Sequence, residues 1–222
     1  MRITTDMDPE RALWAGTGLD PRHRALSLAH PMFSERNTDE VRAAIEWVKG
    51  FTERQRKTPD GLPAHPRIHG QGLLLAGAPG TGKTTLAAAV ACDIRRLGYR
   101  IFFVRYPNYV DAERLVKRVG EDADQAYIAR AHSTISRAED ATLLVLDDVG
   151  HEHLAAGSRF AEDTLESILR NRFSTGLPTI ITTNLSGDQW RGRYSAALRS
   201  FITEATRLIG FLGDDLRGGG HA

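Results

Sequence analysis

Cysteine is nearly absent from this chain of 222 residues, which contains only Cys92. A single cysteine excludes an internal disulfide and any metal site built from several cysteines. Because Cys92 falls in an alanine-rich helical stretch, we expect it to be a small buried residue. The chain also lacks an apolar run long enough to span a membrane, and residues 1–6 contain no apolar signal core. These absences predict a cytoplasmic protein with no membrane partner.

An excess of charge of one sign is missing as well. The chain has 29 Lys and Arg against 28 Asp and Glu, a net charge of +1. It is therefore not a polycation as a whole, and any contact with nucleic acid must come from a local patch. The length suits one large domain, or one domain with a short arm. Residues 218–222 form a glycine-rich tail that we expect to be disordered.

Short apolar runs alternate with helical patterns after a weakly periodic N-terminal arm, residues 1–37. The runs that suit buried strands are 72–76, 100–104, 142–146, 179–183 and, near the end, 208–211. The helical patterns are 38–48, 84–97, 108–119, 124–137, 159–173 and 194–206. This alternation predicts an α/β fold, a parallel sheet flanked by helices on both faces. Ligands of such sheets bind beyond the carboxyl ends of the strands.

A glycine-rich turn between the first strand and its helix fits GxxxxGK[ST] in full. The residues expected to bind phosphate are Gly77, Ala78, Pro79, Gly80, Thr81, Gly82, Lys83, Thr84 and Thr85. Glycines let backbone N–H groups approach the anion, and the following helix presents its positive end. Lys83 can reach the β- and γ-phosphates, and the Thr84 hydroxyl can ligate magnesium. The turn therefore predicts a P-loop that binds ATP with Mg²⁺.

Two adjacent carboxylates follow the third predicted strand. Buried carboxylates are costly unless they bind a cation or accept hydrogen bonds, so Asp147 is the expected magnesium ligand. Asp148 is the candidate catalytic residue that polarises the attacking water. Glu152 is a second acidic candidate for that role. With His151 and His153 it also suggests either a metal site or, as we favour, a solvated loop.

The fourth strand ends in Asn184, whose amide can bond the γ-phosphate and the attacking water together. An ordinary strand-terminating asparagine is the alternative. Arginines are frequent in the last third of the chain, and a phosphoryl-transfer site often takes one from a neighbouring subunit. Most of these arginines must be plain surface residues.

Taken together, these motifs resemble the AAA+ ATPases, and within them the DnaC/IstB group of helicase loaders and transposition ATPases. The resemblance covers about residues 15–217. The stretches that carry it are GLDPRHR at 18–24, LLVLDDVG at 143–150, RFSTGLPTIITTN at 172–184 and GDDLR at 213–217. It implies a P-loop NTPase (AAA+) core at 38–217 with no C-terminal lid domain, and an adenine contact by 18–24.

By position, the resemblance assigns phosphate binding to 77–84, magnesium to Thr84 and Asp147, hydrolysis to Asp148 and sensing to Asn184. It also implies assembly into a homo-oligomer in the ATP state and action on single-stranded DNA or a helicase. One departure concerns the group's Ser-Arg-Leu, which here reads Ser200-Phe201-Ile202. The arginine acting across subunits is then Arg199, Arg193 or Arg172. A second departure is the short stretch before residue 15, which leaves no N-terminal helicase-binding domain.

A possible DNA surface follows the second strand. The residues concerned are Tyr106, Tyr109, Arg114, Lys117 and Arg118. The three cations share one helix face, and cations beside an aromatic ring suit single-stranded DNA. A solvated basic face, balanced by nearby acidic residues, is the alternative. The leading functional hypothesis is a replicative helicase loader with ATPase activity. An IstB-like transposition ATPase and a nucleotide-dependent assembly module with slow hydrolysis remain alternatives.

Overall fold

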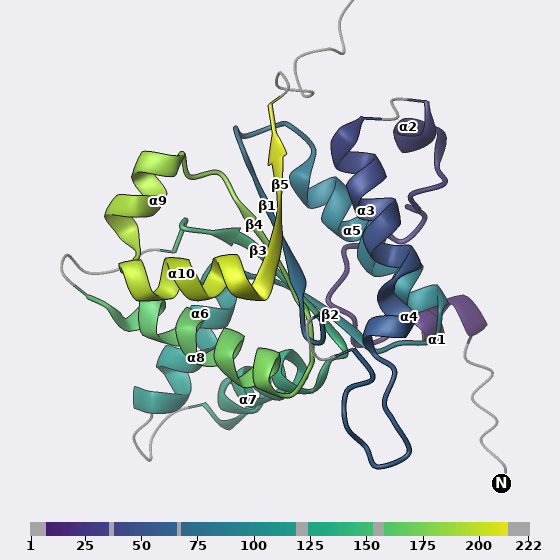
Figure 1. The fold of residues 1–222 in the computed structure, drawn as a ribbon. Helices are drawn as coiled ribbons and strands as arrows, with labels where there is room; N and C mark the ends of the chain where they lie inside the picture. The colour runs from purple at the N-terminus through teal and green to yellow at the C-terminus, as the bar shows by residue number, and fades with distance from the viewer. Residues whose placement is uncertain (1–7, 36–37, 66–67, 119–123, 153–157, 213–222) are drawn as a thin grey trace, which may run out of the picture.

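A five-stranded parallel sheet runs through the centre of the structure (Figure 1). The computed structural model describes residues 8–35, 38–65, 68–118, 124–152 and 158–212. In spatial order the strands are β2 (Ile101–Arg105), β3 (Leu143–Val149), β4 (Thr179–Thr183), β1 (Gly72–Gly77) and β5 (Thr206–Phe211). The predicted α/β class with a parallel sheet is confirmed.

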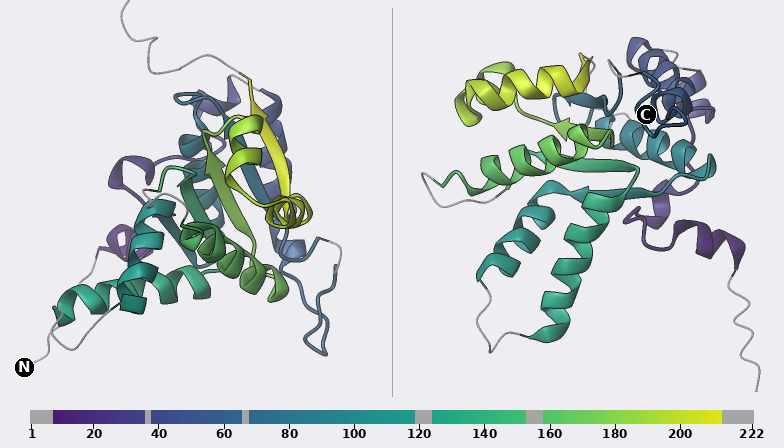
Figure 2. Two further views of the ribbon diagram at one scale, coloured as in Figure 1. Left: turned by 90° about the vertical axis from the view of Figure 1, so that its left-hand side faces the viewer. Right: turned by 60° about the horizontal axis from the view of Figure 1, so that its bottom comes forward.

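Helices cover both faces of the sheet, as Figures 1 and 2 show. One face carries α1 (Pro9–Trp14), the 3₁₀ turn Pro21–His23, α2 (Pro31–Ser34), α3 (Asp39–Lys49), α4 (Phe51–Arg54) and α5 (Lys83–Arg96). The other carries α6 (Tyr106–Arg118), α7 (Gln125–Asp140), α8 (Phe160–Ser174), α9 (Gly187–Arg193) and α10 (Ala196–Ala205). Helices α6 and α7 lie side by side as a hairpin that extends away from the sheet (Figure 2).

The apolar runs form strands because each supplies side chains to two cores. Along β3, Leu143 and Val145 enter the core beneath α5, whereas Leu144 and Leu146 enter the core beneath α8. Alternate residues of a strand point to opposite faces, so a run without polar interruptions suits a sheet covered on both sides. Strand β3 extends to Val149, beyond its predicted end, and therefore includes both aspartates. Helix α9 was not predicted, and residues 213–217 lie outside the described residues.

The N-terminal arm is wrongly predicted as weakly structured within residues 8–35. Its buried apolar side chains are Trp14, Leu19, Leu26, Leu28 and Phe33. Each of its three short helices begins with a proline after a capping residue, at Asp8-Pro9, Asp20-Pro21 and His30-Pro31. Helices this short cannot show helical periodicity in a sequence, which is why the pattern missed them.

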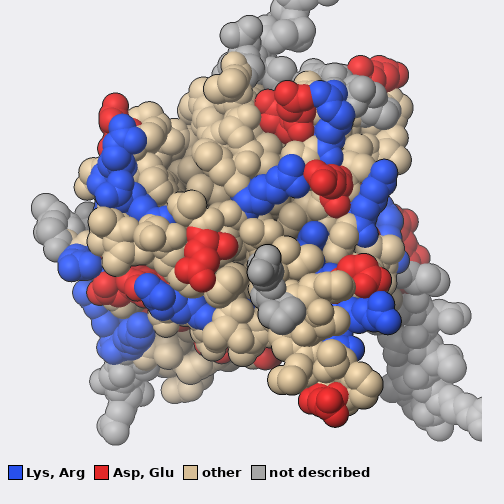
Figure 3. Space-filling view, viewed as in Figure 1, with Lys and Arg blue, Asp and Glu red and all other residues tan. Residues whose placement is uncertain are grey.

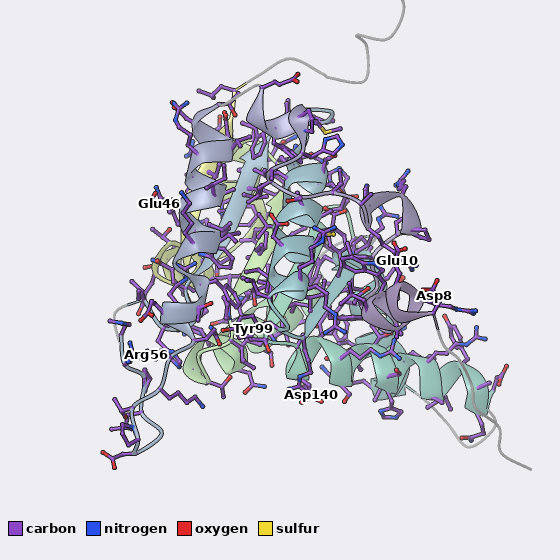
Figure 4. The ribbon with its side chains drawn as sticks, turned by 90° about the vertical axis from the view of Figure 1, so that its right-hand side faces the viewer. Asp8, Glu10, Glu46, Arg56, Tyr99 and Asp140 are labelled. Carbon is purple, nitrogen blue, oxygen red and sulfur yellow. The ribbon has the colours of Figure 1, made fainter. Side chains whose placement is uncertain are left out.

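Polar side chains at the end of α5 fasten this segment to the domain. Arg95 Nε donates to the Leu13 carbonyl at 2.7 Å, and Asp93 Oδ2 accepts the Leu28 N–H at 2.9 Å. Cys92 is fully buried in the same helix, as expected. Figure 4 shows this face, with α3 (Glu46) and α1 (Asp8, Glu10) on either side of α5. The division into 1–37, 38–217 and 218–222 remains a prediction.

Arg172 is a structural residue, which corrects its candidacy as an arginine acting across subunits. The residue is 1% exposed. It donates to Thr179 Oγ1, to the Pro178 carbonyl and to three carbonyls at the end of α7. Burial lowers the pKa of Arg172 to about 9, so the group is still charged at neutral pH. A side chain enclosed in this way cannot reach a neighbouring subunit.

We predict that Arg172→Leu lowers the free energy of unfolding by about 3 kcal/mol or more, because it leaves several buried carbonyls without a donor. Urea denaturation measures the change. Arg170→Leu is the matched control on the same helix, since Arg170 is half-exposed and paired with Glu166. A surface pair of this kind contributes about 0–1 kcal/mol. Equal effects of the two substitutions would contradict the structural role of Arg172.

Candidate nucleotide-binding site

The phosphate loop joins the end of β1 to the start of α5. A side chain at Gly77 would place its Cβ 2.5 Å from the Phe211 carbonyl oxygen, so glycine is required there for close packing on β5. Helix α5 starts after Gly82, which has a φ of 93°, and no described side chain caps this end. The N–H groups of Thr84 and Thr85, in the first turn of α5, thus have no partner within the helix. This end of α5 has the donors and the dipole that bind phosphate.

Lys83 is the first residue of α5, and its side chain folds back onto the phosphate loop. Its side chain is buried, and its Nζ donates to the Ala78 carbonyl at 2.5 Å and to Thr81 Oγ1 at 3.3 Å. Thr81 Oγ1 in turn donates to the Ala78 carbonyl at 2.9 Å. The loop therefore positions one positive charge beside the helix N-terminus, where a polyphosphate needs it.

Asp147, in β3, connects the start of helix α5 with strand β4. Its Oδ1 accepts hydrogen bonds from Thr84 Oγ1 at 2.8 Å and from Thr182 Oγ1 at 2.7 Å. Burial raises the pKa of Asp147 above its usual 3.8, and the bonds from Thr182 and Thr84 oppose this shift. A hydroxyl and a buried carboxylate are hard oxygen ligands, and a divalent cation would offset the cost of burying the anion. Thr84 and Asp147 therefore fit the predicted Mg²⁺ site.

An irregularity in β3 places Asp148 beside Asp147 at the same edge of the sheet. The register between β3 and β4 shifts between Leu146 and Val149, so both aspartates stand opposite Thr182. Asp148 has a φ of 62° and is the only non-glycine residue with a positive φ in the described part of the chain. Its N–H donates to Thr182 Oγ1 at 2.9 Å. A bulge of this kind redirects a side chain that a regular strand would send to the opposite face.

Two residues from neighbouring strand ends hold the Asp148 carboxylate. Asn184 Nδ2, after β4, lies 3.4 Å from Asp148 Oδ1. Arg105, the last residue of β2, forms an ion pair with Asp148 Oδ2 at 3.1 Å. The structure thus brings Thr84, Asp147, Asp148 and Asn184 together. The sequence analysis missed Thr182 and Arg105, although Arg105 follows an apolar run in the same way as Asp147.

Glu152 does not lie in a solvated loop, which corrects that prediction. Its side chain is 2% exposed and is paired with Arg193. It also accepts the Gly150 N–H at 2.9 Å. His151 is exposed, and His153 lies outside the described residues. No group of three or more metal-ligating side chains occurs in the part of the chain that the structure describes.

The arginines proposed to act across subunits differ in their surroundings. Arg193 is held by Glu152 within its own subunit, so a role elsewhere would require that pair to break. Arg199 is half-buried on α10, where its Nε donates to the Ser195 carbonyl at 3.4 Å. Arg199 therefore remains the better candidate of the two.

The predicted DNA surface needs one correction. Tyr106 and Tyr109 are almost fully buried, and Tyr109 donates to Glu113 Oε1 at 2.9 Å, so neither ring can stack on a base. Arg114 and Lys117 both lie over the Phe160 ring of α8 and are paired with Asp111 and Glu113, and Lys117 is the more exposed of the two. On the face shown in Figure 3, cationic and acidic side chains are interspersed.

No helix formed by described residues is long and apolar enough to span a membrane.

The fold and the loop define a P-loop ATP-binding domain of the AAA+ type. Residues 68–204 match the family described as IstB-like ATP binding protein, and the chain belongs to this family. It is 28% identical over 142 residues to the replicative helicase loader DnaI of Bacillus subtilis (strain 168). That alignment covers 63% of this chain but only 42% of DnaI, so the chain spans less than half of this relative's length.

Solved structures show the same fold. The DnaC helicase loader has a TM-score of 0.62 at 23% identity, covering 86% of this chain and 99% of that one. A DnaI crystal structure has a TM-score of 0.60 at 20% identity, covering 89% and 93%. The replication initiator DnaA bound to AMPPCP and single-stranded DNA has a TM-score of 0.58 at 18% identity, covering 88% and 51%. These similarities support the fold.

For the ATPase function proposed below, we predict that Arg105→Ala raises basal ATP turnover, because it releases the carboxylate oxygen of Asp148 that Arg105 occupies. The pair is partly exposed and contributes about 0.2–1 kcal/mol, so the increase should be at most about fivefold. Steady-state phosphate release at saturating ATP measures it, with Arg105→Lys as the control that keeps the charge. A fall in turnover would show that Arg105 supports Asp148 instead of restraining it.

Proposed function

We propose that this chain is an ATPase that acts as a replicative helicase loader on single-stranded DNA, binding ATP with Mg²⁺. The hydrogen bond from Thr84 to Asp147 carries the proposal, because it joins the phosphate loop to the acidic end of β3. Membership of the IstB-like ATP binding family supports nucleotide binding. The similarity to the replicative helicase loader DnaI of Bacillus subtilis supports the helicase-loading role.

The residues divide the chemistry as follows. The N–H groups at the start of α5 and the Lys83 ammonium bind the phosphates. Thr84 and Asp147 would hold Mg²⁺, which when bound would neutralise charge on the phosphates. Asp148 accepts a hydrogen bond from the attacking water and so aligns it with the γ-phosphate. Asn184, next to Asp148, bonds the same water or the γ-phosphate and thereby detects the bound nucleotide.

Two substitutions separate binding from turnover. Lys83→Ala should weaken ATP binding about 10- to 150-fold, because it removes a charge-assisted contact worth about 1.5–3 kcal/mol. Asp148→Asn should retain binding but lower turnover by about 10²- to 10⁴-fold, the usual contribution of a general base. Fluorescent-nucleotide titration and phosphate release measure the two effects. Unchanged affinity in Lys83→Ala would refute the assignment of the loop, and normal turnover in Asp148→Asn would refute the role of Asp148.

Two other functions share this site. An IstB-like transposition ATPase on duplex DNA is favoured by the family description. A nucleotide-dependent assembly module with slow hydrolysis is favoured by the ion pair that holds Asp148. Turnover measured against protein concentration, with single-stranded or duplex DNA, separates the three. A loader that forms homo-oligomers with Arg199 acting in trans should show turnover per subunit that rises with concentration and with single-stranded DNA.

The DNA contact belongs at the far end of the α6–α7 hairpin. Lys117 and Arg118 are exposed at the end of α6, and Arg114 lies one turn earlier. Tyr127 is 59% exposed in the first turn of α7, which lies at the same end of the hairpin. Tyr127 thus supplies the stacking ring that Tyr109 cannot, beside cations that suit the phosphate backbone.

We predict that Tyr127→Ala weakens binding of single-stranded DNA by about 1–3 kcal/mol, the usual contribution of one stacked base. Exchanging Lys117 and Arg118 for Glu should weaken binding further and reduce its salt dependence, since fewer counterions are released. Fluorescence anisotropy with a labelled oligonucleotide at several salt concentrations measures both. Arg56→Glu is the control, because Arg56 is exposed on a distant loop (Figure 4). Binding unchanged by the hairpin substitutions would exclude this surface.

A further inference from the structure

Glu152 is a buried carboxylate that the proposed chemistry does not use. Its Oε1 accepts from Arg193 Nε at 3.0 Å and from the Tyr194 hydroxyl at 3.4 Å, and its Oε2 accepts the Gly150 N–H at 2.9 Å. A second nitrogen of Arg193 also donates to the same carboxylate. Burying an ion pair costs desolvation, so this pair is better explained by what it positions than by stability.

One end of this network is the turn that follows Asp148. The His151 N–H donates to the Asp148 carbonyl at 3.2 Å. Gly150 has a φ of 101°, and a Cβ there would lie 2.6 Å from the Leu185 side chain, next to Asn184. Because Asp148 also has a left-handed backbone, its orientation depends on how the turn from 148 to 152 is held.

The other end is the junction between α9 and α10. Arg193 is the last residue of α9, and Tyr194 follows it before α10 begins. The Arg193 side chain is 31% exposed, although its partner is buried. Trp190 packs against the Tyr194 ring at a centroid distance of 4.7 Å, which fixes the junction locally. The pair therefore connects a surface-accessible helix junction to the turn that carries Asp148.

We propose that Glu152 is a positioning residue for ATP hydrolysis, which with Arg193 holds the turn after β3 so that Asp148 faces the attacking water. The inference rests on the proposed ATPase function. Asp148 performs the proton chemistry, and Glu152 acts through it without touching the nucleotide. Displacing the junction between α9 and α10 moves Arg193, and the turn with Asp148 follows.

The test compares Glu152→Gln, Arg193→Lys and the double variant with the wild type. A misplacement on the order of 1 Å can cost about 10²-fold in rate, so we expect turnover to fall about 10- to 100-fold. Nucleotide affinity should change less than about twofold, because the phosphate loop is untouched. The double variant should lose no more than the stronger single variant, since both remove one interaction.

Glu162→Gln is the matched control. Glu162 is also largely buried and accepts the Ser195 N–H at 2.8 Å at the start of α10. Ser195 and Arg159, the ion-pair partner of Glu162, both lie outside the turn from 148 to 152. It should lower the melting temperature without lowering turnover selectively. If Glu152→Gln is unfolded at the assay temperature, Arg193→Lys tests the same ion pair from its partly exposed side.

The outcomes distinguish the inference from the proposed function. Wild-type protein that binds ATP but does not turn it over would refute the ATPase, and with it this role. Active wild type together with unchanged turnover in Glu152→Gln and Arg193→Lys would refute the positioning role alone. An equal loss in Glu162→Gln would show that general loosening of α10 suffices, which also overturns the proposal.

Discussion

The hydrogen bonds that converge on the Asp147 carboxylate are the constraint on which the site depends. Thr84 comes from the helix after β1, Thr182 from β4, and Asp147 from β3 between them in the chain. Parallel strands bring their carboxyl ends to one edge of the sheet, so residues far apart in sequence meet there without a long loop. Because Asp147 is buried, its charge is costly, and the hydrogen bonds from the two hydroxyl groups favour the ionised form.

The second aspartate shows that adjacent residues can have different surroundings. A regular strand would turn Asp147 and Asp148 to opposite faces. The bulge opposite Thr182 keeps both at the edge of the sheet, and Asp148 takes a left-handed backbone to do so. Arg105 and Asn184 then hold its carboxylate from the two neighbouring strand ends. The orientation of the proposed hydrolytic group therefore depends on three neighbouring strands, β2, β3 and β4.

Arginines and tyrosines illustrate how burial decides the role of a residue type. Arg172 is enclosed and donates to carbonyls, Arg193 is paired with a buried glutamate, and Arg199 lies half-buried on α10. Tyr109 lies in the core, whereas Tyr127 is exposed on the paired helix. Residue type and spacing could not separate these cases, because each depends on which face of a helix the rest of the fold covers.

The sequence by itself determined the alternation of the five strands with the longer helices, the parallel sheet, the phosphate-loop motif and the pair of aspartates that follows an apolar run. These features depend on local periodicity and on short motifs, which adjacent residues specify. Only the tertiary structure decided that Arg105 and Thr182 contact the aspartates, that Glu152 is buried against Arg193, and that residues 8–35 pack onto α5. These contacts join segments separated by tens of residues, and packing sets their geometry, so no local pattern could reveal them.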